Sequence, residues 1–109
     1  MTDRGLLELA AKAAGIEITF APWPMRFVDA QDQKKAFTVR WNPLDDDGDA
    51  LRLAVKLGIP LEFCHASGIV TATDPWSALA FDEPPAGDSY ASARLAIVRA
   101  AAQIAREAS

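Results

Sequence analysis

The stretch from Trp41 to Gly58 reads W-N-P-L-D-D-D-G-D-A-L-R-L-A-V-K-L-G, and this pattern predicts a turn followed by a helix. Asn42-Pro43 favours a turn, and the aspartates that follow supply negative charge and acceptors to the free amides of a helix start. Gly48 argues against a continuous helix from Pro43, so we place the helix start at Asp46 or Asp47 and its end at Gly58. The residues that we assign to this structural motif are Trp41, Asn42, Pro43, Asp45, Asp47, Gly48 and Asp49.

The predicted helix is apolar around most of its circumference. Its polar residues form one narrow stripe of Asp49, Arg52 and Lys56. An apolar surface of this width is typical of a helix with several packed neighbours, so we expect it to be the most buried helix of the fold. Trp41 continues an apolar strand face and is expected in the core.

Two strand-rich segments flank this stretch, and a helix lies beyond each of them. The first helix begins at Thr2 and ends at Gly15, and the last begins at Asp88 or Ser89. Alternating apolar residues predict strands on both sides, at 16–20, 37–41, 59–63 and 69–73. Segments 26–30 and 76–81 are candidates for a further strand. We therefore predict a single domain, residues 1–109, of α+β class, in which a mostly antiparallel sheet of four to five strands packs with three helices.

The helical stretches also resemble a known family. The Trp41–Gly58 motif is similar to the phage ABA sandwich domain, a family of small phage and prophage proteins of unknown function. The likeness extends to the helical stretch before the motif, L-L-E-L-A-A-K-A-A-G-I, and to the one after it, A-R-L-A-I-V-R-A-A-A-Q-I. The likeness covers the three helices; segments 17–40 and 60–88 agree only in length and order. It implies a phage origin and an α/β/α sandwich, without an activity. Alternating strands would leave one sheet face exposed, and this favours a two-layer α/β sandwich as the alternative.

Composition excludes several classes of protein. The net charge is −4, and residues 41–109 carry ten acidic and five basic side chains, which disfavours nonspecific nucleic-acid binding. No apolar run approaches the roughly 20 residues of a membrane span, so we expect no membrane partner and a cytoplasmic location, in a bacterial host cell if the phage origin holds. The single cysteine, Cys64, excludes an internal disulfide.

The aspartate run suggests a metal site, but its spacing does not fit a calcium loop. If Gly48 is aligned with the glycine of an EF-hand loop, Pro43 occupies the first ligand position and Ala54 the last. We interpret the run as turn and helix cap, with no metal site and no cofactor. A small metal- or ligand-binding domain or enzyme that uses the Asp45–Asp49 loop is the alternative.

Catalytic patterns are missing from the sequence. Cys64 and His65 are adjacent on an expected strand and would point to opposite faces, so they do not form a nucleophile and base. We interpret Cys64 as a small hydrophobic residue and His65 as a strand-end residue. No nucleophile elbow or glycine-rich phosphate loop is present, and we expect no enzyme and no catalytic residues.

Two tryptophans are candidates for protein recognition. Trp23 lies between two prolines and Trp76 follows Asp74-Pro75, and tryptophan is enriched at the energetic centres of protein interfaces. We therefore predict a noncatalytic phage accessory protein that binds protein, either itself as a homodimer or a phage or host protein. A weaker alternative is an acidic mimic of nucleic acid; the slight net charge and the arginines of the last helix argue against it.

Overall fold

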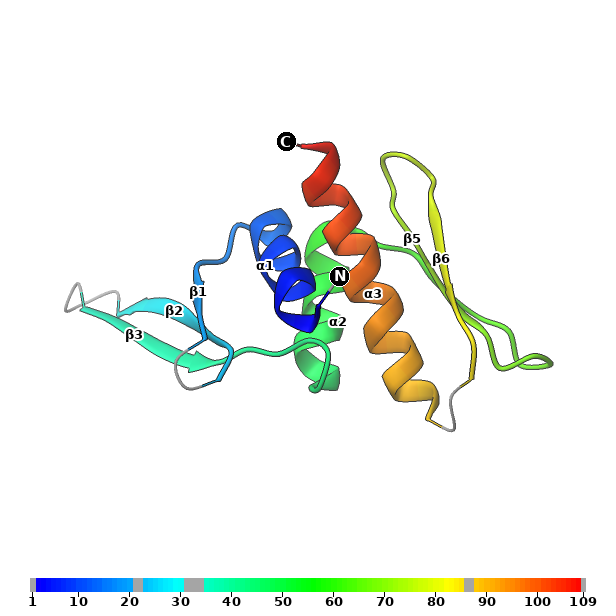
Figure 1. The fold of residues 1–109 in the computed structure, drawn as a ribbon, viewed down its shortest axis with the longest axis horizontal. Coiled ribbons are helices and arrows are strands. Elements are labelled where there is room, and N and C mark those ends of the chain that lie inside the picture. Colours follow the sequence, from blue (N-terminus) through cyan, green and yellow to red (C-terminus); the bar gives the residue numbers. More distant parts are fainter. Residues whose placement is uncertain (1, 21–22, 31–34, 86–87, 109) are drawn as a thin grey trace.

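The computed structural model describes residues 2–20, 23–30, 35–85 and 88–108 (Figure 1). These described residues form three helices: α1 (Asp3–Ala14), α2 (Asp47–Leu57) and α3 (Ser89–Glu107). Its six strands are β1 (Ile18–Thr19), β2 (Met25–Ala30), β3 (Lys35–Arg40), β4 (Leu61–Phe63), β5 (Val70–Thr73) and β6 (Ala80–Glu83).

The strands form two antiparallel sheets of three strands each. β1, β2 and β3 make sheet A, β4, β5 and β6 make sheet B, and neighbouring strands are consecutive in the chain. The α+β class, the three helices and the antiparallel pairing are confirmed. The prediction of one sheet with four to five strands is wrong, since the helix between the two strand groups carries the chain from one sheet to the other.

The helices lie between the two sheets (Figure 1). Sheet B packs on α3, whereas β2 and β3 make their main contacts with one another, so their hairpin projects from the helical body. This order of layers differs from both predicted arrangements, in which one sheet packs with helices on one or both faces. Within each sheet every strand pairs with its neighbour in sequence, and among the described residues no strand of sheet A pairs with a strand of sheet B.

The helix boundaries follow from their caps. Thr2 Oγ1 accepts a hydrogen bond from the Gly5 amide (3.1 Å), and Asp88 Oδ1 accepts one from the Tyr90 amide (2.9 Å). Gly15 and Gly58 end α1 and α2 in the left-handed conformation, at φ of 70° and 66°. These starts and ends confirm the predicted boundaries, because side-chain acceptors and glycine satisfy the unpaired groups of helix ends.

The core is centred on α3. The alanines of this helix allow close approach of α1 and α2 on one side and of sheet B on the other; those that are fully buried are Ala96, Ala100, Ala101 and Ala102. Trp41 also lies in the core and is 3% exposed.

The prediction that the second helix is the most buried is wrong. Leu51 and Val55 of α2 are 57% and 74% exposed, because α2 packs through one face that contains Ala50, Leu53 and Ala54. When a helix is apolar around most of its circumference, its sequence pattern does not indicate which face packs against the core. Among the described residues, no helix has the length and apolar character needed to span a membrane.

Candidate functional site

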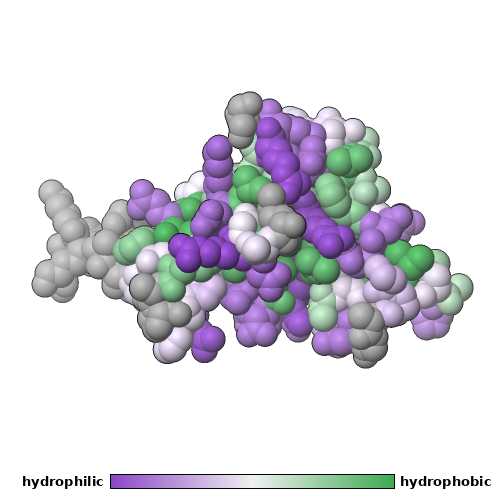
Figure 2. All heavy atoms as spheres, viewed as in Figure 1, coloured by the Kyte–Doolittle hydropathy of each residue, from purple (hydrophilic) through white to green (hydrophobic). Residues whose placement is uncertain are grey.

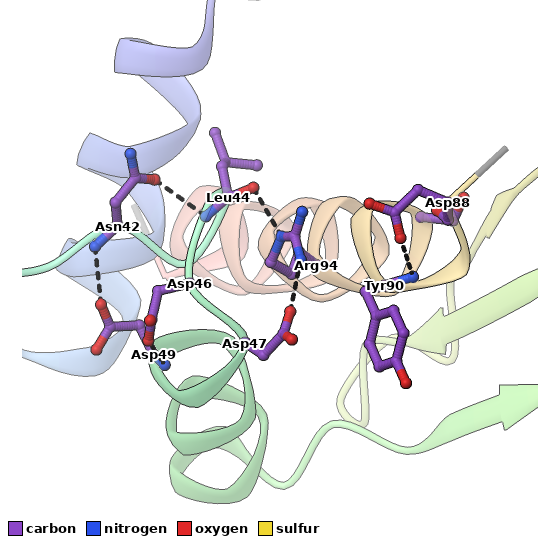
Figure 3. A network of polar contacts seen from close by, with 9 residues as sticks. Asn42, Leu44, Asp46, Asp47, Asp49, Asp88, Tyr90 and Arg94 are labelled. Atoms are coloured by element: carbon purple, nitrogen blue, oxygen red, sulfur yellow. Dashed lines mark hydrogen bonds and ion pairs between the residues drawn. The ribbon is translucent and has the colours of Figure 1, made fainter. Parts of the chain in front are cut away.

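The acidic loop before α2 is held by its own hydrogen bonds (Figure 3). Asp46 caps the helix by accepting a hydrogen bond from the Asp49 amide at 2.8 Å. The buried Asp49 carboxylate accepts hydrogen bonds from the Asn42 amide at 3.0 Å and from Arg52 Nη2 at 2.7 Å. Asn42 Oδ1 in turn accepts one from the Leu44 amide at 3.1 Å. The loop is therefore closed on itself.

A second set of contacts ties this loop to α3. Arg94 Nη1 lies 2.5 Å from Asp47 Oδ1, and Arg94 Nε donates to the Leu44 carbonyl at 2.9 Å (Figure 3). The Arg94 side chain is mostly buried, so this bridge joins two elements that are distant in sequence. Asp47 is thus used in helix packing.

Three carboxylates of this loop line a pocket, and two of them, Asp46 and Asp49, are already paired. The pocket has a volume of about 380 Å³, and its lining residues are Arg40, Asn42, Asp45, Asp46, Asp49 and Arg52. Two arginines in the same lining would repel a cation. Within the described ranges, no three His, Cys, Asp or Glu side chains are grouped so that they could hold a metal ion. The geometry supports a structural role for the loop.

We expect no response of this protein to divalent cations. Calcium, magnesium or manganese would have to displace Arg52 from Asp49 and the backbone amides from Asp46 and Asp49, and those hydrogen bonds stabilise the native turn. Isothermal calorimetry should record no binding heat, and the thermal midpoint should not change with added cation. A midpoint that rises with cation concentration, and that Asp45→Asn abolishes, would contradict this prediction.

The turn between β5 and β6 presents Trp76 to solvent. Trp76 is 79% exposed. Beneath it the Asp74 carboxylate is completely buried and accepts hydrogen bonds from the Trp76 amide (2.8 Å) and from Ser77 Oγ (2.9 Å). Burial raises the pKa of Asp74, but the hydrogen bonds from Trp76 and Ser77 outweigh it and hold the pKa below its ordinary value. A buried anion therefore fixes the turn that carries an exposed tryptophan.

The expected strand at 76–81 begins too early. Residues 75–77 form a turn, and β6 starts at Ala80. Ala78 has a φ of 62°, a left-handed conformation that costs a non-glycine residue roughly 1 kcal/mol. The Asp74 amide donates to the Leu79 carbonyl and the Ala78 amide to the Asp74 carbonyl, which closes the loop despite this strain. Neither Asp74 nor Ala78 was predicted from the sequence as part of the candidate site.

The preceding hairpin repeats this turn, and the repeat is a signal that could have revealed it. The Cys64 amide donates to the Ile69 carbonyl, and the Gly68 amide donates to the Cys64 carbonyl. Ser67 Oγ accepts from the Ile69 amide as Ser77 Oγ accepts from that of Leu79. The shared pattern is a serine, a left-handed small residue and an aliphatic residue: S-G-I in one turn and S-A-L in the other.

Cys64 occupies the position in this turn that corresponds to Asp74. It is exposed, so the interpretation of Cys64 as a small hydrophobic residue is wrong. Hydrogen bonds from the Ser67 side chain and amide lower the pKa of the Cys64 thiol. His65 is also exposed.

Substitution of the left-handed residue should change the free energy of unfolding by different amounts in the two turns. We expect Gly68→Ala to lower the free energy of unfolding by about 1–2 kcal/mol, since φ is +75° and the added Cβ would lie 3.0 Å from Pro85 Cβ. Urea unfolding followed by circular dichroism gives this value. Ala78→Gly is the matched control and should not destabilise by more than a few tenths of a kcal/mol. Equal losses in the two variants would contradict this explanation.

Trp23 lies two residues before β2 of the other sheet and is 49% exposed. The Arg40 guanidinium carbon is 5.3 Å from the centre of its ring, which is the geometry of a cation–π contact. Sheets A and B lie at opposite ends of the molecule (Figure 1), so Trp23 and Trp76 belong to two separate surfaces. The structure does not bring the two predicted recognition residues together.

Comparisons with known proteins return no match: no family model, curated protein or solved structure matches this chain. The resemblance of the three helical stretches to a phage family stays a prediction. The surfaces and contacts described above are therefore the basis for a function.

Proposed function

We propose that this chain is a noncatalytic protein-binding module whose recognition centre is Trp76. The observation that carries the proposal is a largely exposed indole on a turn that a buried carboxylate holds in place. A rigid turn loses little conformational entropy on binding, and a large aromatic side chain buries much apolar area in the partner. Leu79, 47% exposed on the same turn, extends the apolar contact.

The wider surface supports binding rather than catalysis. Eight large hydrophobic side chains among the described residues are exposed. Figure 2 shows hydrophilic side chains over much of the middle of the molecule and hydrophobic ones at the surface on either side. Asp46, Asp47 and Asp49 are used in capping and helix packing, and this leaves a metal or substrate site at the Asp45–Asp49 loop with the Asp45 carboxylate alone as a ligand.

The proposal includes the nature of the partner. We infer that the module works in the cytoplasm of a bacterial cell as a phage accessory protein, that it forms homo-oligomers, and that Trp76 is free to engage a phage or host protein. The acidic and mixed-charge surface supports the absence of nonspecific nucleic-acid binding.

Affinity capture with matched baits tests this function. Immobilised wild-type protein, Trp76→Ala and Leu51→Ala are exposed to a lysate of the cells that carry the gene. Leu51 is a comparably exposed apolar residue on α2 and serves as the control. We expect a protein partner to be retained by the wild type and by Leu51→Ala and to be lost from Trp76→Ala. Equal retention by all three baits, or no retained protein on any, would refute the proposed role of Trp76.

A further inference from the structure

Sheet B extends beyond the helix that covers it. Leu61 pairs with Ala72 and Phe63 with Val70, so both β4 side chains lie on the inner face of the sheet, and Glu62 lies on the outer face. α3 packs on β5 and β6, and β4 lies past the edge of this contact. Phe63 is therefore 62% exposed although it belongs to the inner face. The inner face of β4 lacks a helix to cover it.

Tyr90 lies close to Phe63, at the start of α3. Phe63 and Ser89 line the same pocket, which has a volume of about 220 Å³, and Tyr90 follows Ser89 in the chain. The Tyr90 side chain is 69% exposed. Figure 3 shows its ring pointing away from α3, near the bridge between Arg94 and Asp47 of α2. We call Phe63 and Tyr90 the aromatic pair.

The exposed side of α2 starts at the same bridge. Asp47, Leu51 and Val55 are four residues apart, so they follow one another along one stripe of the helix. Asp47 contacts Arg94 of α3, and the next two members of the stripe are exposed. We call Leu51 and Val55 the α2 ridge. Leu51 lies one helical turn from Asp47 and Tyr90 one turn from Arg94, so the ridge and the aromatic pair flank one ion pair.

The charged side chains that border this surface already have roles within the chain. Arg52, which follows Val55 around α2, pairs with Asp49. Asp88 accepts the Tyr90 amide as the cap of α3. The residues that line the pocket beside the aromatic pair include no carboxylate, lysine or arginine. The surface therefore offers mainly apolar contact, and repulsion between like charges is a small obstacle to its contact with a second copy.

The apolar area of this surface is close to what a dimer needs. Covering the exposed parts of two aliphatic and two aromatic side chains removes roughly 300–500 Å² of apolar surface from water. A standard interface buries about 800 Å² per partner, of which about 60% is apolar. The ridge and the aromatic pair therefore supply most of the apolar area of one interface. Leu61, on the same face as Phe63, and Ile69, in the same pocket, are half-buried and add to it.

We propose that two copies of this chain form a two-fold dimer in which the α2 ridge of each copy packs on the aromatic pair of the other. The inference rests on the homo-oligomer of the proposed function and names its surface. A two-fold contact needs one surface that carries both halves of the contact, and here an exposed helix stripe lies beside an uncovered sheet face. The helix of the second copy supplies the layer that β4 lacks. Trp76 follows the opposite end of β5 from Phe63, so the dimer leaves it exposed.

Charge placed on either half of the surface tests this dimer. In sedimentation velocity, the wild type should show a monomer–dimer equilibrium that stops at twice the 11.7 kDa mass of one chain. Val55→Lys on the ridge and Tyr90→Glu on the aromatic pair should each weaken the dimer at least about tenfold, because the contact would bury an unpaired charge. The double variant should associate more tightly than either single variant, since each lysine then meets the glutamate of the other copy.

Leu79→Glu places a charge outside this surface and should dimerise like the wild type. Circular dichroism checks the fold of every variant. The inference would be overturned by a wild type that stays monomeric or assembles beyond a dimer, by a dimer that both single variants leave unchanged, or by a double variant no tighter than the single ones. Val55→Lys and Tyr90→Glu keep Trp76 and should retain the partner protein in the capture experiment, so failure of the dimer leaves the recognition role to its own test.

Discussion

Trp41→Ala is expected to lower the free energy of unfolding by about 3–5 kcal/mol, a large part of the stability of a domain of this size. The indole is 3% exposed and belongs to the same buried cluster as Leu7, Leu53 and Ile97. Its removal leaves a cavity at the point where the chain passes from sheet A to the acidic loop. Urea unfolding followed by circular dichroism measures the loss.

The two other tryptophans of the chain serve as controls for this prediction. Trp23→Ala and Trp76→Ala make the same chemical change at exposed positions, so each should destabilise the monomer by no more than about 1 kcal/mol. The midpoint for Trp41→Ala should also fall well below those of the two controls. Similar losses at all three positions would mean that Trp41 does not anchor the core.

Features that depend on neighbouring residues were predictable from the sequence. The starts of α1, α2 and α3 at Thr2, Asp46 and Asp88 follow from side-chain caps, and the ends of α1 and α2 follow from Gly15 and Gly58. These interactions span at most four residues, so the local pattern contains all the information that they need.

Features that depend on distant packing were not predictable. The alternation of apolar residues identifies strands, but the pattern does not say whether β3 and β4 share a sheet, and here α2 separates them. The exposure of Leu51 and Val55 depends on which face of α2 meets α3. Within the candidate site, Trp76 was singled out from the sequence because it follows Asp74-Pro75, and its role stays a prediction. The role of Asp74 depends on burial, which a single sequence does not reveal.

Asp74→Ala is expected to cost about 2–4 kcal/mol and to lower the thermal midpoint by on the order of 10 °C. The substitution leaves the Trp76 amide and the Ser77 hydroxyl without their acceptor beneath a turn that also strains Ala78. Asp74→Asn keeps the shape of the side chain and one acceptor oxygen, so it should lower the free energy of unfolding by less. If recognition depends on the conformation of the turn as well as on the indole, the Asp74→Ala bait should retain less partner protein than the wild type, although Trp76 is intact.

The charge of Asp74 gives this prediction a pH signature. Its pKa is lower in the folded protein than in the unfolded chain, so the carboxylate contributes stability above its ordinary pKa of about 3.9 and loses that contribution as the pH falls below it. The stability advantage of the wild type over Asp74→Asn should therefore be constant near neutral pH and shrink below about pH 4. The Glu107 side chain also contributes to the lowered pKa of Asp74, so the comparison is repeated in a Glu107→Gln background, which isolates the contribution of Asp74. An advantage that persists unchanged to pH 2.5 would show that the buried carboxylate does not stabilise the turn through its charge.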